Sequence, residues 1–373
     1  MSKGEKKRST DEKLSRRFYL LNACVAVILL AAVFVSISQF GAEAWHNRRQ
    51  IALVIPGEKN QLGWNKSQYL AVKNTCNELN YDLVLCENIS SDTDLCRKTA
   101  DELSKRGINN IIFANGCLLK NIVEFEKIYP KITFCTIESI SALYTNGSYS
   151  ILSFEASYLA GILAGLHTKT NKIGYIAPFM NPEINQGINA FTLGVLRVNP
   201  NAEVLINWTG SWDNPLSEEQ AVQTIRAAGV DFLTYHQNGQ TVPNACARLG
   251  INFVAFNEVY PNNPRCLASI KINWNEVYMD IIKYKNAYEV KDDHAFGIYQ
   301  GIVEFEVLGN ISKREQVLLD MAKWEIKKGR IIFSGEIFDR NGIKRCSVNE
   351  AISLKSLQNN MNWLIKGVRI VGS

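Results

Sequence analysis

From residue 51 onward, short runs rich in β-branched residues alternate with longer amphipathic stretches. This alternation predicts βαβ units, in which parallel strands form a sheet with helices on its faces. In a first series the predicted strands cover 51–55, 82–86, 110–113 and 131–137, and the predicted helices cover about 66–79, about 93–106 and a stretch that ends at 129.

A second series of the same kind begins after Ser150. Small residues recur in ASYLAGILAGLHT, and they allow one helix to pack closely on another. The predicted strands cover 172–178, 203–208, 231–235 and 252–257, and the predicted helices cover about 184–198, 218–228 and 242–249. ASIKI at 268–272, a helix to about 287 and FGIYQG at 296–301 must join one sheet or the other.

Two such series predict an α/β protein of two doubly wound parallel-sheet lobes that are joined by a hinge. The folded part is expected over 50–373, with one lobe at about 50–152 plus 270–302 and the other at about 153–269 plus 303–373. The expected crossings lie at Leu152–Glu155, Asn257–Ser269 and Gly301–Glu304. Beyond about 310 the pattern predicts a helix near 313–328, a strand at 330–333 and a turn at 338–342 without a site role.

The chain before residue 50 has a different character. Residues 1–17 hold seven Lys and Arg against three Asp and Glu, and residues 18–40 form an uncharged apolar run. About 20 apolar residues span a bilayer, and basic residues collect on its cytoplasmic side. We therefore predict a basic cytoplasmic tail, then a transmembrane signal anchor, with the rest outside the cell membrane. Cleavage near Ala42-Glu43-Ala44, which would release a periplasmic form, is the alternative.

The charge and the cysteine content argue against some classes of function. Most of the net charge of +5 belongs to the tail, so the exported part is close to neutral and nucleic-acid binding is not expected. Cys24 lies inside the apolar run, where lipidation is not expected. No Cys-x-x-Cys pair or Cys/His cluster appears, so neither a zinc site nor another cofactor is predicted. Disulfides Cys246–Cys266 and Cys117–Cys135 are candidates, and buried free thiols are the alternative.

Parallel α/β sheets bind ligands beyond the carboxyl ends of their strands, so the residues after each strand are the candidates. The first such segment, 56–72, contains compact polar groups and an indole. A second indole, Trp212, lies in the loop 209–215. Two indoles from opposite lobes would clamp a planar ligand. The candidate ligand-binding residues are Asn60, Gln61, Trp64, Asn65, Glu138, Trp212, Asn238, Asn257 and Lys271, with Glu258 beside them.

Four segments resemble the BMP (basic membrane protein, PnrA-like) family of substrate-binding proteins, which have the type I periplasmic binding fold. They are LGWNKSQYLAV (62–72), SFEASYLAGILAGLHTKTNKIGYIAP (153–178), GSWDNP (210–215) and SIK (269–271). The resemblance implies a purine nucleoside as the ligand and delivery to an ABC transporter permease. It also implies stacking by Trp64 and Trp212, base recognition by Asn65 and ribose contact by Lys271.

The chain departs from the pattern of that family at its acidic positions. Pro56, Asn60 or Gln61, Glu138 and Asn257 stand where aspartates or other acidic residues are expected. Neutral amides accept weaker hydrogen bonds than carboxylates do, so a changed ligand or a degenerate domain is an alternative.

Two other classes of function remain as alternatives. An enzyme would need convergent catalytic groups, and the four histidines are widely separated in a chain without a G-x-S-x-G, Walker or H-E-x-x-H motif. We therefore do not predict an enzyme. A membrane-anchored sensory or regulatory protein would bind its ligand at the same strand-end residues. The 17 residues before the apolar run are too few for a signalling domain, so a partner protein would have to transmit the signal.

Overall fold

The computed structural model describes residues 27, 29–31, 33, 49–116, 124–136, 149–258, 260, 262–285 and 294–372. The predicted tail lies outside them, as does the predicted membrane segment except for five helical, exposed positions. No helix within the described ranges is long and apolar enough to cross a bilayer. Contacts divide the chain into two units, one with the residues up to Arg49 and Asn80–Asp82, the other with Gln50–Leu79 and Leu83 onward.

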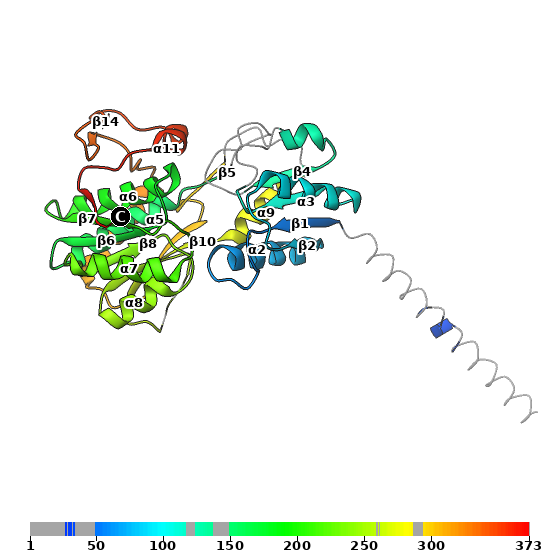
Figure 1. Ribbon diagram of the computed structural model, residues 1–373, viewed down its shortest axis with the longest axis horizontal. Helices are drawn as coiled ribbons and strands as arrows, with labels where there is room; N and C mark the ends of the chain where they lie inside the picture. Colours follow the sequence, from blue (N-terminus) through cyan, green and yellow to red (C-terminus); the bar gives the residue numbers. More distant parts are fainter. Residues whose placement is uncertain are drawn as a thin grey trace, which may run out of the picture. The chain divides into compact units, whose positions relative to one another are not determined.

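The first series forms a four-stranded sheet with the order β2-β1-β3-β4 (Figure 1). Its strands are β1 (Gln50–Val54), β2 (Asp82–Cys86), β3 (Asn110–Phe113) and β4 (Thr133–Thr136). β3 runs parallel to both β1 and β4. The helices are α2 (Trp64–Leu79) and α3 (Thr93–Lys105), which begins where the Asp92 carboxylate accepts from the Leu95 N–H.

The second series forms a seven-stranded sheet with the order β12-β10-β9-β8-β6-β7-β15. Only β12 is antiparallel to its neighbour. The strands are β6 (Lys172–Ala177), β7 (Glu203–Trp208), β8 (Phe232–Tyr235), β9 (Asn252–Phe256), β10 (Cys266–Ile272), β12 (Val303–Val307) and β15 (Val368–Ile370). The sequence prediction of parallel α/β sheets is confirmed.

Four helices belong to this part of the chain, one before β6 and three between later strands. They are α5 (Ser153–His167), α6 (Pro182–Val198), α7 (Pro215–Ala227) and α8 (Thr241–Leu249). The small residues expected to allow close packing do so between α5 and α6. A Cβ on Gly161 would lie 1.9 Å from the Phe191 carbonyl oxygen, so only glycine permits this approach of the two backbones.

The remaining elements connect and extend the two sheets. They are β5 (Tyr149–Ile151), which pairs with β11 (His294–Phe296), then α9 (Trp274–Lys285), α10 (Lys313–Lys327), the hairpin β13 (Ile337–Phe338) and β14 (Lys344–Cys346), and α11 (Leu354–Asn360). α9 packs against α2, although it directly follows β10 of the larger sheet. β10 continues to Ile272 in that sheet, so residues 270–272 lie with the second series. The proposed lobe boundaries otherwise stay predictions.

The strand predicted at 330–333 is wrong. Arg330 instead donates its N–H to the Glu325 carbonyl after α10, and Ile332 and Phe333 are buried in the core without strand pairing. Their hydrophobicity therefore reflects burial and not a sheet. The predicted turn at 338–342 is confirmed, as the connection between β13 and β14.

The candidate bridge between Cys246 and Cys266 is not formed, and the alternative of buried free thiols is confirmed for this pair. They lie in one apolar cluster, where burial raises the pKa of the Cys266 thiol to about 11 and that of Cys246 further still. Such thiols stay protonated and unreactive near neutral pH. The second candidate bridge, Cys117–Cys135, stays a prediction, because Cys117 lies outside the described residues.

Candidate ligand-binding site

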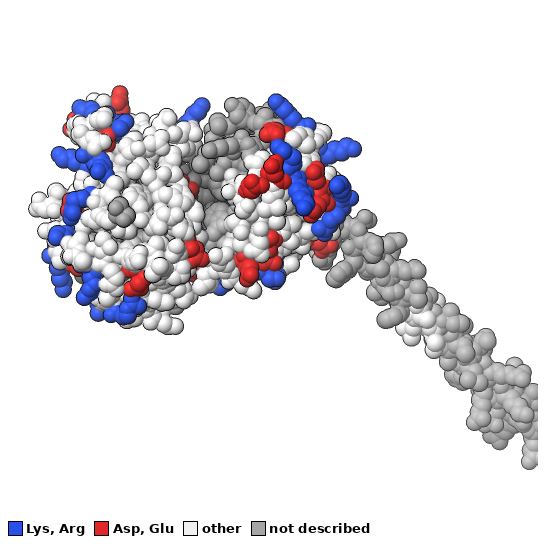
Figure 2. Space-filling view, viewed as in Figure 1, with Lys and Arg blue, Asp and Glu red and all other residues white. Residues whose placement is uncertain are grey.

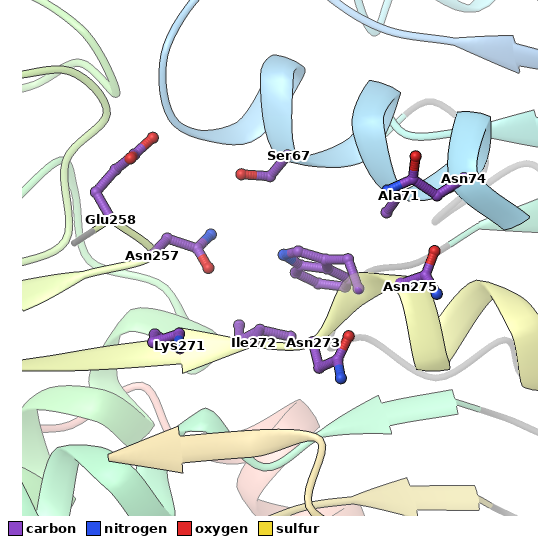
Figure 3. A pocket seen from close by; sticks show the side chains of 10 residues that line it. Ser67, Ala71, Asn74, Asn257, Glu258, Lys271, Ile272, Asn273 and Asn275 are labelled. Atoms are coloured by element: carbon purple, nitrogen blue, oxygen red, sulfur yellow. The ribbon is translucent and has the colours of Figure 1, made fainter. Parts of the chain in front are cut away.

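A cavity of about 390 Å³ lies between one face of α2 and the segment that links β10 to α9 (Figure 3). Cavities of a few hundred Å³ are typical of small-molecule sites. Its lining residues are Ser67, Ala71 and Asn74 from α2, Asn257 and Glu258 after β9, and Lys271, Ile272, Asn273, Trp274 and Asn275. Amide side chains thus provide most of the polar groups around a small apolar surface.

The cavity contains two of the predicted site residues, Asn257 and Lys271. Asn257 follows β9 in the left-handed region, with φ of 61°, and its N–H donates to the Ile270 carbonyl. Asn tolerates this conformation better than most residues do. Two adjacent strands therefore present Asn257 and Lys271 at the cavity.

Lys271 does not stand in the cavity as an isolated cation. Its Nζ lies 3.2 Å from a carboxylate oxygen of Glu306 and 3.5 Å from one of Glu304. Partial burial lowers the pKa of Lys271, but these two carboxylates outweigh it and raise the pKa above its usual range. With Glu258 nearby, three carboxylates accompany one ammonium, so the surroundings do not favour an anionic ligand.

Trp64 begins α2, and its indole is held by protein contacts. Its Nε1–H donates to the Ala114 carbonyl at 2.7 Å, and its ring meets that of Trp274 edge to face at a centroid distance of 5.3 Å. These contacts fix the orientation of the ring.

Asn65 and Gln61 form a pair beside Trp64. The Asn65 amide nitrogen donates to Gln61 Oε1 at 2.7 Å, and Gln61 Nε2 donates to Asp213 in the loop after β7. Asn65 is 7% exposed, and its Oδ1 has no hydrogen-bond partner among the described residues. Asn65 therefore keeps a buried acceptor available.

The first N–H groups of α2 are capped by side chains from the larger sheet. Asn238, which follows β8, accepts from the Trp64 N–H at 3.3 Å, and Glu258 accepts from the Gly63 N–H at 3.2 Å. A carboxylate at a helix N-terminus also interacts favourably with the helix dipole. Both acceptors thereby connect α2 to the strand ends of the other sheet.

Trp212 belongs to a different group of rings. It is 36% exposed and packs edge to face on Phe179 and His236, with centroid distances of 5.3 Å and 5.9 Å. His236 stacks on Phe256 at 4.0 Å, and burial lowers the pKa of its imidazole to about 3. The two indoles proposed as a clamp thus each have separate protein partners.

Two other predicted residues add little to this geometry. Asn60 is exposed in the turn before α2, and Glu138 lies outside the described residues.

Sequence reasoning missed Ser67, Asn74, Asn273, Trp274 and Asn275, which line the cavity. Asn273 to Asn275 directly follow β10, so the rule of inspecting strand ends could have found them. Ser67, Ala71 and Asn74 share a helix face by their spacing, but the sequence does not show which partner that face meets.

Comparison with known proteins places the chain in a family. The family model described as ABC transporter substrate-binding protein PnrA-like matches residues 48–338. The chain is 24% identical over 335 residues to the purine-binding protein BAB2_0673 of Brucella abortus, covering 88% of this chain and 95% of that protein. It is also 24% identical over 221 residues to the transcriptional activator protein med of Bacillus subtilis, covering 58% of this chain and 68% of that protein.

A solved structure has the same fold. The solute-binding protein of an ABC transporter system from Aeropyrum pernix K1 matches with a TM-score of 0.62 at 16% identity, covering 76% of this chain and 92% of that chain. The family model spans most of the folded region, and the parallel sheets agree with it. The chain therefore belongs to the ABC transporter substrate-binding protein PnrA-like family.

Proposed function

We propose that this substrate-binding protein takes a purine or a purine nucleoside and delivers it to an ABC transporter. The solute-binding role follows from the family, and the ligand is the proposal. The observation that carries it is the amide-lined cavity where two parallel strands end, in a chain similar over nearly its whole length to a purine-binding protein.

The chemistry of the cavity suits a neutral, planar, polar molecule. Asn74 and Asn257 each offer a donor and an acceptor, which match the mixed donors and acceptors on a purine edge. Trp274 and Ala71 supply apolar surface for its ring. The lining of the cavity thus combines amides that would orient the ligand with apolar side chains that would bury its flat face.

We propose no catalytic activity. In the part of the chain that the structure describes, no group of His, Cys, Asp and Glu is arranged to hold a metal ion, and the buried His236 stays neutral near pH 7. Recovery of an unchanged purine nucleoside after prolonged incubation would support binding without chemistry.

For the location, we propose a single N-terminal membrane anchor with the binding domain outside the cell. The uncharged run at 18–40 after a basic tail supports this orientation. The mass and N-terminal sequence of the mature protein distinguish a retained anchor from cleavage after Ala44.

A sensory or regulatory role is the second candidate, because one relative is named a transcriptional activator. In that case ligand binding would alter a partner protein and would not support uptake. Deletion of the gene distinguishes the two: loss of nucleoside uptake supports transport, and unchanged uptake with altered gene expression supports regulation.

The test of the ligand is isothermal titration of the full-length protein in detergent with purine bases, purine nucleosides and pyrimidine nucleosides. Asn257→Gly removes an amide from the cavity while keeping a residue that accepts the positive φ. Asn80→Gly is the matched control, since Asn80 also has a positive φ, of 59°, and is not one of the residues that line the cavity.

We expect purine binding that weakens about tenfold in Asn257→Gly, as for loss of a good hydrogen bond, and is unchanged in Asn80→Gly. Absence of heat with every purine, from protein that unfolds cooperatively, would rule out the proposed ligand.

A further inference from the structure

Trp274 carries a buried hydrogen-bond donor that the fold leaves unused. The residue is 7% exposed and lines the cavity, and its Nε1–H has no hydrogen-bond partner among the described residues. A buried N–H without a partner is costly, so most proteins satisfy such groups or use them. The donor therefore needs an explanation beyond packing.

The neighbouring indole shows the contrast. Trp64 is in ring contact with Trp274, yet its own Nε1–H is satisfied by the Ala114 carbonyl. Of these two packed tryptophans, one has a structural hydrogen bond and the other faces the cavity without one. An apolar ring would fill the place of Trp274 equally well if packing were its only role.

The position of Trp274 is fixed by the chain around it. The Asn273 N–H donates to the Ile302 carbonyl at 2.8 Å, and the next residue is the first of α9. At the other side, the Asn275 carbonyl and side chain meet the Thr75 hydroxyl of α2. The indole is therefore held in place before any ligand arrives, which lowers the entropic cost of using its N–H.

A buried acceptor accompanies this donor. Asn65 Oδ1 on α2 is also without a partner in the described part of the chain, and Asn65 is the residue next to Trp64. Of these two groups, only Trp274 belongs to a residue that lines the cavity, so its N–H is the one that a ligand bound there can reach.

We propose that Trp274 determines ligand specificity by donating its Nε1–H to a ring nitrogen of the bound purine. This inference rests on the proposed function and adds to it the residue that reads the ligand edge. The N–H selects ligands with an acceptor at that place, because a C–H there would leave the donor buried and unpaired.

The test is Trp274→Phe in the full-length protein in detergent, which keeps an aromatic ring against Trp64 and removes only the N–H donor with part of the ring. We expect the purine affinity to fall about tenfold, which corresponds to ~1.4 kcal/mol. Thermal unfolding of the ligand-free protein should shift less than in the control described next, because both variants lose buried ring area but Trp274→Phe loses no hydrogen bond of the protein. The control Trp64→Phe loses the bond to Ala114 and should lower the thermal midpoint.

Deaza analogues, in which one ring nitrogen is replaced by C–H, provide the second arm. In the wild-type protein one analogue should bind about tenfold more weakly than its parent, and in Trp274→Phe that penalty should disappear, as in a double-mutant cycle. Unchanged affinity in Trp274→Phe, or equal penalties for every analogue in both proteins, would overturn this inference alone. Failure of the wild-type protein to bind any purine would overturn the proposed function, and this inference with it.

Discussion

At the scale of single residues, Gly63 shows how tightly the start of α2 is fitted to the opposite strand ends. Its φ is +80°, and a Cβ there would lie 2.6 Å from Asn238 Oδ1. Its own N–H donates to Glu258. Backbone conformation and a close neighbour both require glycine at this point.

We expect Gly63→Ala to lower the free energy of unfolding by about 2 kcal/mol, from the positive φ and the displaced Asn238 together. Gly107→Ala is the control, because Gly107 has φ of +77° and no atom within 4 Å of the added Cβ. Urea unfolding of both variants separates the two contributions. Equal losses would mean that the contact with Asn238 is unimportant.

His236 predicts a pH dependence of stability. Burial lowers its pKa from the ordinary 6.5 to about 3, so the unfolded chain binds a proton that the folded chain does not between these values. Stability should therefore fall as pH drops below about 6.5, by up to roughly 1.4 kcal/mol per pH unit. Urea unfolding from pH 7 to 4 measures the slope, and His236→Gln should reduce it. An unchanged slope in that variant would assign the effect to other groups.

At the scale of elements, the alternation of strands and helices was readable from local patterns. β2, β3 and β7 begin and end at the predicted residues, because each is a short apolar run between turn residues. β12, α11 and β15 were not predicted. β15 is three residues long and exists through pairing with β7, about 160 positions earlier in the chain, which no local pattern reveals.

The capping of α2 by Asn238 and Glu258 depends on contacts between a helix of one sheet and loops of the other. It leads to a third prediction. In Glu258→Ala and Asn238→Ala, hydrogen exchange of the Gly63 and Trp64 amides should become about tenfold faster, since each loses a bond worth ~1 kcal/mol or more. Glu258→Gln keeps an acceptor and should show a smaller change. Exchange at Leu103 in α3 is the internal reference.

Ligand contact at the same loops should slow this exchange in the wild-type protein. If the two amides exchange at equal rates in all variants, the hydrogen bonds from the strand ends do not stabilise the start of α2.

At the scale of the whole molecule, charge distribution bears on the ligand. On the face shown in Figure 2, basic and acidic side chains are interspersed, with uncharged areas between them. Lys271, which lines the cavity, is paired with Glu304 and Glu306, and Glu258 lines the same cavity. The electrostatic potential of these carboxylates favours binding of a neutral solute over a phosphorylated one, because it repels negative charge.

We therefore expect a purine nucleoside to bind at least about tenfold more tightly than its 5′-monophosphate, a difference of ~1.4 kcal/mol. The discrimination should shrink at high salt, because screening weakens the repulsion. Titrations at low and high ionic strength measure this. Glu306→Gln should narrow the difference, and equal affinities for both compounds would contradict the electrostatic argument.

The sequence by itself determined the parallel α/β class, most strands and helices of the two sheets and the positions of Asn238 and Asn257 just after strands, because strand and helix periods and turn residues are local. Only the tertiary structure decided which helix face meets which strand end. It placed Trp274 beside Trp64, 210 positions apart, satisfied one indole and left the other without a partner. Hydrogen bonds and burial between distant segments depend on packing, so the face of α2 that lines the cavity and the unpaired indole emerge only when the chain is folded.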